Sequence, residues 1–323
     1  MNALAPTLRR LRDLLFRRDY GNLAWGVELM RALGDPALFD AMLRGVAWTP
    51  PSGDGHGELR VRGFFHNARD RRRWDITLVL ATLAAAPPES RVAAALIADI
   101  TSLALDRRIE PLPGDVLDLA PLRALVRLER LSLRTALRPR DLSPLASLPR
   151  LQSLAIEGPL DTLAELAGAP ALTTLTVSSP TLESPGATGP LPALRVLDLS
   201  WSLRLRSLDL LEGLDALEEL RLTTQAMPVG TLLALRRSPA LRRVRLRDGS
   251  RLRDDEAALL GTLEVVVVDS GAWPLAAHEA QTRLREFSAT TPRLRTLEGL
   301  ANGALERLAL ADCRALTSVA SLA

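Results

Sequence analysis

The chain of 323 residues contains no lysine, so all 41 of its basic residues are arginine. Mechanisms that need a lysine are therefore excluded, including Schiff-base catalysis and the lysine-bearing phosphate loop. Arginine in place of lysine, together with abundant alanine, indicates a GC-rich bacterial genome, and selection for arginine chemistry is the alternative. Because 38 acidic residues leave a net charge of only +3, charge does not argue for a nucleic-acid binder.

Residues that carry chemistry are also scarce. The single cysteine, Cys313, permits no internal disulfide framework, and a buried structural role is expected for it. No Gly-x-Ser-x-Gly elbow, glycine-rich phosphate loop or HExxH helix occurs. The acidic run Asp254-Asp255-Glu256 is expected to form a solvated face. No metal spacing involves the histidines, which lie far apart: His56, His66 and His278. We expect no enzyme activity and no cofactor.

Long apolar stretches are missing as well. No run of about 18 apolar residues, the length needed to span a membrane as a helix, occurs anywhere. Arg9, Arg10, Arg12 and Asp13 interrupt the first 16 residues, where a signal peptide needs an apolar segment. The sequence therefore predicts a soluble, cytoplasmic protein.

What the sequence does have is a repeat. The pattern apolar-x-x-apolar-x-apolar recurs at intervals of 21 to 24 residues, and a further copy begins at Ile100. The second and third apolar residues are two apart, so they share the buried face of a short strand. One such strand cannot bury its apolar face alone, but stacked copies form a continuous core. The nine regularly spaced copies begin at Leu128, Leu151, Leu172, Leu194, Leu217, Leu241, Leu263, Leu284 and Leu305.

These copies resemble the leucine-rich repeat family, bacterial type. The resemblance implies an α/β solenoid over residues 98–323, with one strand of a curved parallel sheet per repeat. Leucine-rich repeats usually have asparagine or cysteine three residues past the last apolar residue of each strand. No copy here has asparagine at that position, as Ala136 and Ser202 illustrate, so we expect irregular curvature. Pro185–Pro192 should form an irregular loop. The strands are predicted near 100–105, 128–133, 151–156, 172–177, 194–199, 217–222, 241–246, 263–268, 284–289 and 305–310.

Residues 1–97 differ in kind, because their apolar residues recur at helical spacing. Gly34, Asp35 and Pro36 indicate a helix end, an N-cap and a first helical position. A loop is predicted over residues 49–57, and residues 59–65 are compatible with strand or helix. This helical region is expected to cap the first strand; an independent binding role is the alternative.

The solvent-facing side of the predicted strands carries the candidate partner-binding residues. Arginines gather there on two adjacent strands, with a tryptophan at the edge of the same surface and two carboxylates close by. Arginine and tryptophan are enriched at interface hot spots. Mutual repulsion of four arginines favours an acidic partner, although ordinary solvated arginines are the alternative. The candidate residues are Asp198, Trp201, Glu219, Arg221, Arg243, Arg245 and Arg247.

The sequence thus predicts a non-catalytic scaffold that binds a protein partner on the concave face of the repeats. One alternative is a sensor or regulatory subunit of a larger bacterial assembly, in signalling or defence, with the helical region as its output surface. Another is binding of nucleic acid or a different polyanion through the arginines. Leu316, Val319 and Leu322 begin a further unit without a polar cap, so we also expect self-association through the C-terminal end.

Overall fold

The computed structural model describes residues 4–15, 20–52, 55–65, 74–107, 117–186, 189–247, 253–260, 262–269, 283–290, 297 and 304–317. His66, His278, Val319 and Leu322 lie outside the described residues. The chain divides into two compact units, Met1–Leu154 and Ala155–Ala323, which are described separately. The boundary predicted between residues 97 and 98 lies inside the first unit and stays a prediction.

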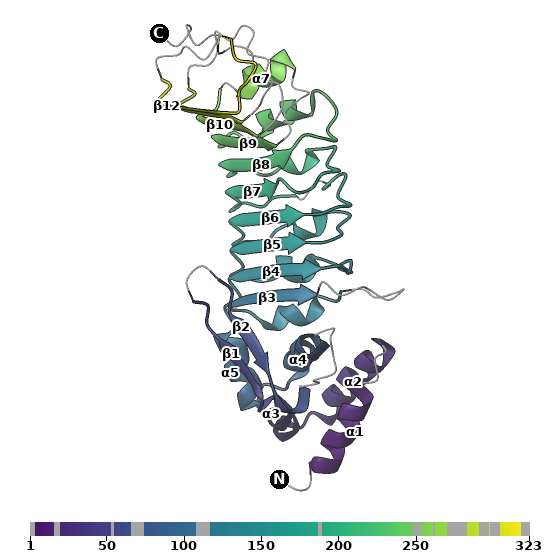
Figure 1. The fold of residues 1–323 in the computed structure, drawn as a ribbon. Helices are drawn as coiled ribbons and strands as arrows, with labels where there is room; N and C mark the ends of the chain where they lie inside the picture. Colours follow the sequence, from purple (N-terminus) through teal and green to yellow (C-terminus); the bar gives the residue numbers. More distant parts are fainter. Residues whose placement is uncertain are drawn as a thin grey trace. The chain divides into compact units, whose positions relative to one another are not determined.

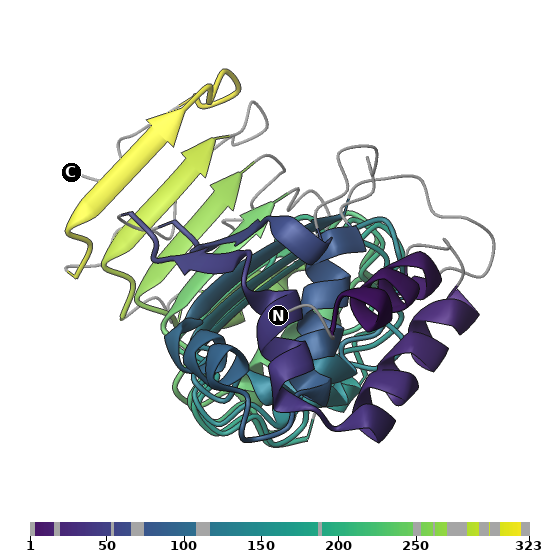
Figure 2. The same cartoon turned by 90° about the horizontal axis from the view of Figure 1, so that it is seen from below.

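The first unit begins with helices, as the sequence predicts. Asp35 caps α3 by accepting a hydrogen bond from the Ala37 N–H at 2.9 Å, and Pro36 occupies the first turn. Phe39 and Met42 of α3 are fully buried. Figure 2 shows α1 and α2 lying side by side. The α-helices of this region are α1 (Ala5–Leu15), α2 (Tyr20–Leu33), α3 (Pro36–Leu43), α4 (Trp74–Ala85) and α5 (Arg91–Asp99).

A β-hairpin interrupts these helices, where the sequence predicts a loop over residues 49–57 and leaves residues 59–65 undecided between strand and helix. Strands β1 (Val46–Thr49) and β2 (Glu58–Val61) pair antiparallel, and Gly63–Phe65 forms a short 3₁₀ turn, η1. The Trp48 indole N–H donates to the Ser102 carbonyl at 3.1 Å, and the Gly57 N–H donates to Ser102 Oγ at 3.2 Å. Tertiary docking onto Ser102 therefore stabilises strands too short to be recognised by periodicity.

Ten parallel strands form one sheet in chain order among the described residues (Figure 1). The inward apolar residues of β4 to β11 are exposed by no more than 2%, which confirms the predicted register. The strands are β3 (Ser102–Arg107), β4 (Arg130–Thr135), β5 (Ser153–Glu157), β6 (Thr174–Ser178), β7 (Val196–Leu199), β8 (Glu219–Thr223), β9 (Arg243–Arg247), β10 (Val265–Asp269), β11 (Glu286–Thr290) and β12 (Arg307–Ala311).

Each strand begins about two residues later than predicted. The first apolar residue of a copy, such as Leu151, is buried but lies in the preceding turn, where its N–H bonds the Leu148 carbonyl. Bonds to the neighbouring repeat start only with the next two residues, because the N–H groups of Gln152 and Ser153 both bond the Glu129 carbonyl at 2.8 and 3.0 Å. The leucine pattern therefore marks the core of a repeat better than the limits of its strand.

Hydroxyl groups take over part of the role of the missing asparagines. Ser202 Oγ donates to the Val177 carbonyl at 3.2 Å and accepts from the Ser179 N–H at 3.3 Å. One repeat earlier, Ser179 Oγ accepts from the Leu160 N–H at 3.0 Å, and Thr181 Oγ1 donates to the Leu160 carbonyl at 2.7 Å. Serine and threonine thus pair backbone groups of adjacent turns that would otherwise be buried without partners.

Short turns return the chain between strands, as the three-residue spacing of Leu142, Leu145 and Leu148 predicts. The described part of Pro185–Pro192 contains no helix, also as predicted. The returning elements are η2 (Ala120–Ala124), α6 (Ser143–Ala146), η3 (Ala164–Leu166), η4 (Asp209–Leu211), η5 (Thr231–Arg237) and α7 (Asp254–Leu260).

The acidic run at the start of α7 corrects one expectation, because Glu256 is not solvated. Its side chain is 98% buried within the second unit, with a relative exposure of 2%. Oε1 accepts from the N–H groups of Gly230 and Leu232 at 2.9 and 3.0 Å, and Oε2 accepts from the Arg253 N–H at 3.0 Å. The carboxylate joins the starts of η5 and α7, where backbone donors have no partner within the helix.

Candidate functional site

The solvent-facing side of strands β6 to β12 in the second unit, which we call the display face, carries the predicted site residues. It is formed by the first and third residues of each strand and by the fifth residue of every strand except β7, which has four residues. Parallel pairing places Glu219, Arg243 and Val265 in one row across the strands. A second row contains Asp198, Arg221, Arg245 and Val267. The third row contains Thr223, which is buried, followed by Arg247 and Asp269.

Arg221 is held by two carboxylates of the chain itself. Its Nε lies 2.6 Å from Glu219 Oε1, and its Nη1 lies 3.6 Å from Asp198 Oδ2. The hydrogen bond that Arg221 donates to Glu219 is the main cause that raises the pKa of Arg221, with Asp198 adding to it. Three of the predicted site residues therefore form one ion-pair cluster.

The other arginines of the display face differ in their partners. Arg245 Nε lies 2.8 Å from Asp269 Oδ2, and Arg307 Nη1 lies 3.0 Å from Glu286 Oε1. The expectation that these arginines need an external acid is therefore wrong for Arg221 and Arg245, because neighbouring strands supply carboxylates. Within the described part of the chain, Arg243 has no ion-pair partner and its side chain is exposed.

Trp201 lies in the turn after β7 and packs against an arginine two strands away. The Arg247 guanidinium carbon lies 4.0 Å from the centre of the Trp201 ring, and Trp201 keeps 56% of its surface exposed. Such cation–π contacts at exposed sites contribute about 0.5–1 kcal/mol. The stack fixes a large apolar side chain at the edge of the display face without burying it.

A row of alternating charges borders the display face, and we did not recognise it from the sequence. It comprises the residues just before β7 to β12: Arg195, Glu218, Arg242, Glu264, Arg285 and Glu306. They pair as Arg195–Glu218, Arg242–Glu264 at 3.7 Å and Arg285–Glu306 at 3.3 Å. Each exposed pair contributes little energy. If a repeat packed against the next but one instead of its neighbour, residues of like charge in this row would lie side by side. The alternation therefore favours the observed order of packing. In the sequence, the row is recognisable as alternating arginine and glutamate at the second residue of each successive copy of the leucine pattern.

The display face is hollowed over β10. Val265 and Val267 point outward and are half-buried at the base of a cavity of about 370 Å³. Charged side chains of both signs surround these valines: Glu219, Arg221, Arg243, Arg245, Glu286 and Arg307. Two outward valines among charged side chains can offer one bound group both apolar contact and ion pairs.

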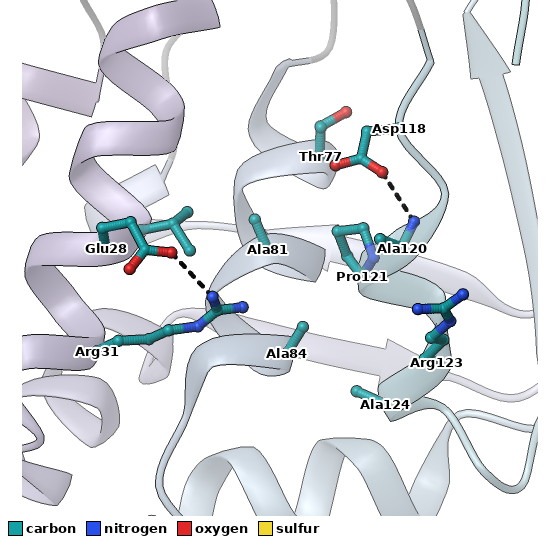
Figure 3. Close-up of a pocket in the computed structure, with 11 residues that line it drawn as sticks. Glu28, Arg31, Thr77, Ala81, Ala84, Asp118, Ala120, Pro121, Arg123 and Ala124 are labelled. Carbon is teal, nitrogen blue, oxygen red and sulfur yellow. Dashed lines mark hydrogen bonds and ion pairs between the residues drawn. The ribbon is translucent and has the colours of Figure 1, made fainter. Parts of the chain in front are cut away.

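The first unit has a groove of its own, of about 580 Å³. Figure 3 shows α2 supplying Glu28 and Arg31 on one side and the η2 segment supplying Arg123 on the other, with Ala81 and Ala84 of α4 between them. Glu28 and Arg31 pair with each other at 2.9 Å. On the α2 side of the groove, the charges of Glu28 and Arg31 therefore neutralise each other.

A stripe of exposed apolar residues also runs along α2. Trp25, Leu29 and Leu33 are four residues apart and expose 75%, 44% and 47% of their surfaces. Among the other aromatic residues of this region, Phe65 is buried and packs edge-on against Phe64, with ring centres 5.0 Å apart.

The described residues hold no group of three or more His, Cys, Asp or Glu side chains that could bind a metal ion. His56 is largely exposed, with Nδ1 3.3 Å from Ser102 Oγ, and the burial of part of its ring, followed by the charge of Arg130, lowers its pKa. Cys313 is half-buried, with Sγ 3.7 Å from the Ala289 carbonyl of the preceding repeat. No helix in the described ranges is both long and apolar enough to cross a membrane.

Comparison with known proteins supports the fold. No model of a known protein family matches the chain, and no curated protein matches it. Among solved structures, the chain is similar to an internalin (inlF) from Listeria monocytogenes at 20% identity and a TM-score of 0.50. That match covers 69% of this chain and 65% of the internalin, so the chain spans less than two thirds of it.

An internalin C2 (inlC2) from the same organism is 18% identical with a TM-score of 0.42, and the match covers 72% of this chain and 90% of that one. Matches at such identities are informative about the fold alone, and of the two only the first supports it. Together with the parallel strands and the buried leucine register, it shows that the protein is a leucine-rich repeat solenoid with a helical N-terminal region.

Proposed function

We propose that the protein is a non-catalytic scaffold that binds a protein partner on the display face of its second unit. The observation that carries the proposal is that β9 presents two binding groups on one face, the Trp201–Arg247 stack at its end and Arg243, without an ion pair among the described residues, at its start. Trp201 offers a rigid apolar surface, and Arg243 offers a guanidinium with free donors. By contrast, β6 of the same unit displays only Thr174, Thr176 and Ser178.

The internal ion pairs favour a protein partner over a polyanion. Strands β7 to β12 of the display face carry five arginines and four carboxylates, which leaves a local formal charge of +1. The arginines are Arg221, Arg243, Arg245, Arg247 and Arg307, and the carboxylates are Asp198, Glu219, Asp269 and Glu286. A nucleic acid releases counterions in proportion to the phosphates that the protein neutralises, so it needs many unpaired cations. A protein surface with a few acidic groups suits this balance better.

Substitutions of Trp201 and Arg243 test the proposal. The partner would be captured from the native organism with the full chain, and its affinity would then be measured for Trp201→Ala and Arg243→Glu. Each should weaken binding by about 2 kcal/mol, because one removes the apolar anchor and the other replaces attraction by repulsion. Trp25→Ala, which removes another exposed tryptophan, serves as the matched control. Unchanged affinity in both display-face variants would contradict the proposal.

A salt titration separates the two classes of partner. Binding to a protein should weaken only gently between low and physiological salt, because few counterions are released. A steep linear fall of log K against log salt would indicate a polyanion instead.

The first unit offers a second candidate surface, in which the chain is a regulatory subunit of a larger assembly. The exposed stripe of Trp25, Leu29 and Leu33 beside the α2–α4 groove supports this function, because exposed apolar side chains grouped on one helix face are typical of an interface. Stoichiometric copurification of a partner that is lost in Trp25→Ala but retained in Trp201→Ala would favour it.

Self-association is also proposed, through strand β12. Among the described strands, β12 pairs with β11 alone, and its inward residues Leu308 and Leu310 are half-buried, whereas their counterparts in β11 are fully buried. Unpaired strand edges with apolar neighbours readily pair with other chains. Light scattering should show a mass that rises above 35.0 kDa with concentration. A constant monomer mass would refute this association.

A further inference from the structure

We propose that the hollow over β10 binds an aliphatic side chain of an acidic partner segment, and that Arg243 binds a carboxylate of the same segment. This inference rests on the proposed function, because it defines the chemistry of what the display face binds. It concerns one part of that face, formed by Val265, Val267 and the charged side chains around them.

The base of the hollow is unusual for this face. In the central row of the display face, the positions equivalent to Val267 hold Thr176, Asp198, Arg221, Arg245, Ser288 and Ala309. Val267 is thus the only branched aliphatic residue of that row within the described strands. Val265 adjoins it on the same strand, between Arg243 and Glu286 of the neighbouring strands. An aliphatic side chain placed on these valines would remove apolar surface of both partners from water.

The charges around the hollow determine which polar group accompanies that side chain. Arg245 and Arg307 are engaged by Asp269 and Glu286, and Glu219 is engaged by Arg221. Arg243 alone among the described rim residues has no ion pair. An incoming carboxylate can therefore accept two parallel hydrogen bonds from the Arg243 guanidinium without breaking an existing ion pair. A partner amine would have to displace an arginine from Glu286 or Glu219.

Strand geometry suggests how the two groups are spaced. In an extended segment, side chains two residues apart lie on the same side and are about 6.6 Å apart. Arg243 and Val265 are neighbours across adjacent strands, where spacing is about 4.8 Å. An extended segment crossing β9 and β10 could place an aliphatic residue on the valines and an Asp or Glu two residues away at Arg243. The expected pattern is aliphatic-x-acidic, in either direction.

A random peptide library displayed on phage is the probe. It would be selected on the full chain, and the affinities of enriched peptides would be measured as synthetic peptides. Arg243→Gln should weaken binding about tenfold, because it removes a charge-assisted bidentate contact. Val265→Thr should weaken it roughly fivefold, because a hydroxyl replaces a methyl group under the aliphatic side chain.

Each variant has a matched control in the same unit. Arg242→Gln removes the neighbouring exposed arginine, which pairs with Glu264 and does not line the hollow. Val196→Thr changes the half-buried valine that occupies the position of Val265 in β7. Both controls should retain affinity within about twofold, since neither contacts the hollow. Circular dichroism of all four variants would confirm that the sheet is intact.

The outcomes separate this inference from the proposed function. Peptides that lose binding in Trp201→Ala but bind Arg243→Gln and Val265→Thr normally would overturn the hollow and leave the display face as the binding surface. Enrichment of basic peptides would also overturn it, because Glu286 would then be the receptor group. Peptides that bind all display-face variants equally would overturn both proposals. Enrichment of aliphatic-x-acidic peptides with the expected losses would support both.

Discussion

Removal of the Glu256 carboxylate should destabilise the second unit more than any change in the neighbouring surface charges. The carboxylate accepts three backbone hydrogen bonds, from Gly230, Leu232 and Arg253, and is almost completely buried. A hydrogen bond to a charged group contributes roughly 1.5–3 kcal/mol, so three set an upper limit of about 5–9 kcal/mol. Water entering the vacated space would satisfy part of the donors, and we expect Glu256→Ala to cost about 3–5 kcal/mol.

Two further variants sharpen this prediction. Glu256→Gln keeps an oxygen for the N–H groups of Gly230 and Leu232 but turns an amide toward the Arg253 N–H, so it should cost about 1–2 kcal/mol. Asp255→Ala removes the neighbouring carboxylate, which forms an exposed ion pair with Arg253 at 3.2 Å. That change should cost less than about 1 kcal/mol. The order of the three costs separates loss of the buried hydrogen bonds from loss of local negative charge.

Urea unfolding followed by circular dichroism would give these free energies, with hydrogen exchange of residues 230–237 as a local measure. The local measure matters because repeats can unfold separately from one another. Faster exchange at the start of η5 in Glu256→Ala, without change in β6, is the expected result. If Glu256→Ala and Asp255→Ala unfold within about 0.5 kcal/mol of each other, the carboxylate does not hold the two helix starts together.

The core of the repeats could be predicted from the sequence because burial leaves a strong signal. Leucine at fixed intervals must face inward, and the strands follow from that condition alone. Leu220 and Leu222 illustrate this, since both are fully buried where predicted. Strand limits could not be predicted equally well, because the first leucine of each copy is also buried although its backbone lies in a turn.

The hairpin of the first unit was less predictable for a physical reason. Its strands are four residues each, and their position depends on contacts with Ser102, more than 40 residues away in the chain. Periodicity within a short window contains no information on such contacts. Glu256 was misinterpreted for the same reason, because Gly230 and Leu232 belong to the preceding repeat.

The candidate site shows a different limit. The sequence located Arg221, Arg243, Arg245 and Arg247 on one face, because register follows from the leucines. It did not reveal that Asp198, Glu219 and Asp269 would neutralise two of them, since that depends on side-chain geometry between strands. The hollow over β10 was missed as well, although four consecutive valines at 265–268 require two of them to point outward.

Further variants test the register and the docking of the hairpin. Leu220→Asp places a charge where the side chain is fully buried and should cost several kcal/mol, so an unshifted thermal melting curve would refute the register. Gly57→Ala should loosen the hairpin, because a Cβ there would lie 2.5 Å from Trp48 Nε1, and the Trp48 fluorescence should shift toward that of exposed indole. The pH dependence of the same contact follows from His56. Its pKa is lowered from about 6.5 by burial and by Arg130, so the folded hairpin favours the neutral ring, whose Nδ1 can accept the Ser102 hydroxyl proton. The unfolded state then binds more protons below pH 6.5, and the stability present above that pH is lost as pH falls through the folded pKa. Exchange of the Gly57 N–H should therefore show greater opening at pH 5 than at pH 7.5 after correction for intrinsic rates, and His56→Gln should abolish that difference; an equal pH effect in both proteins would exclude His56 as its cause.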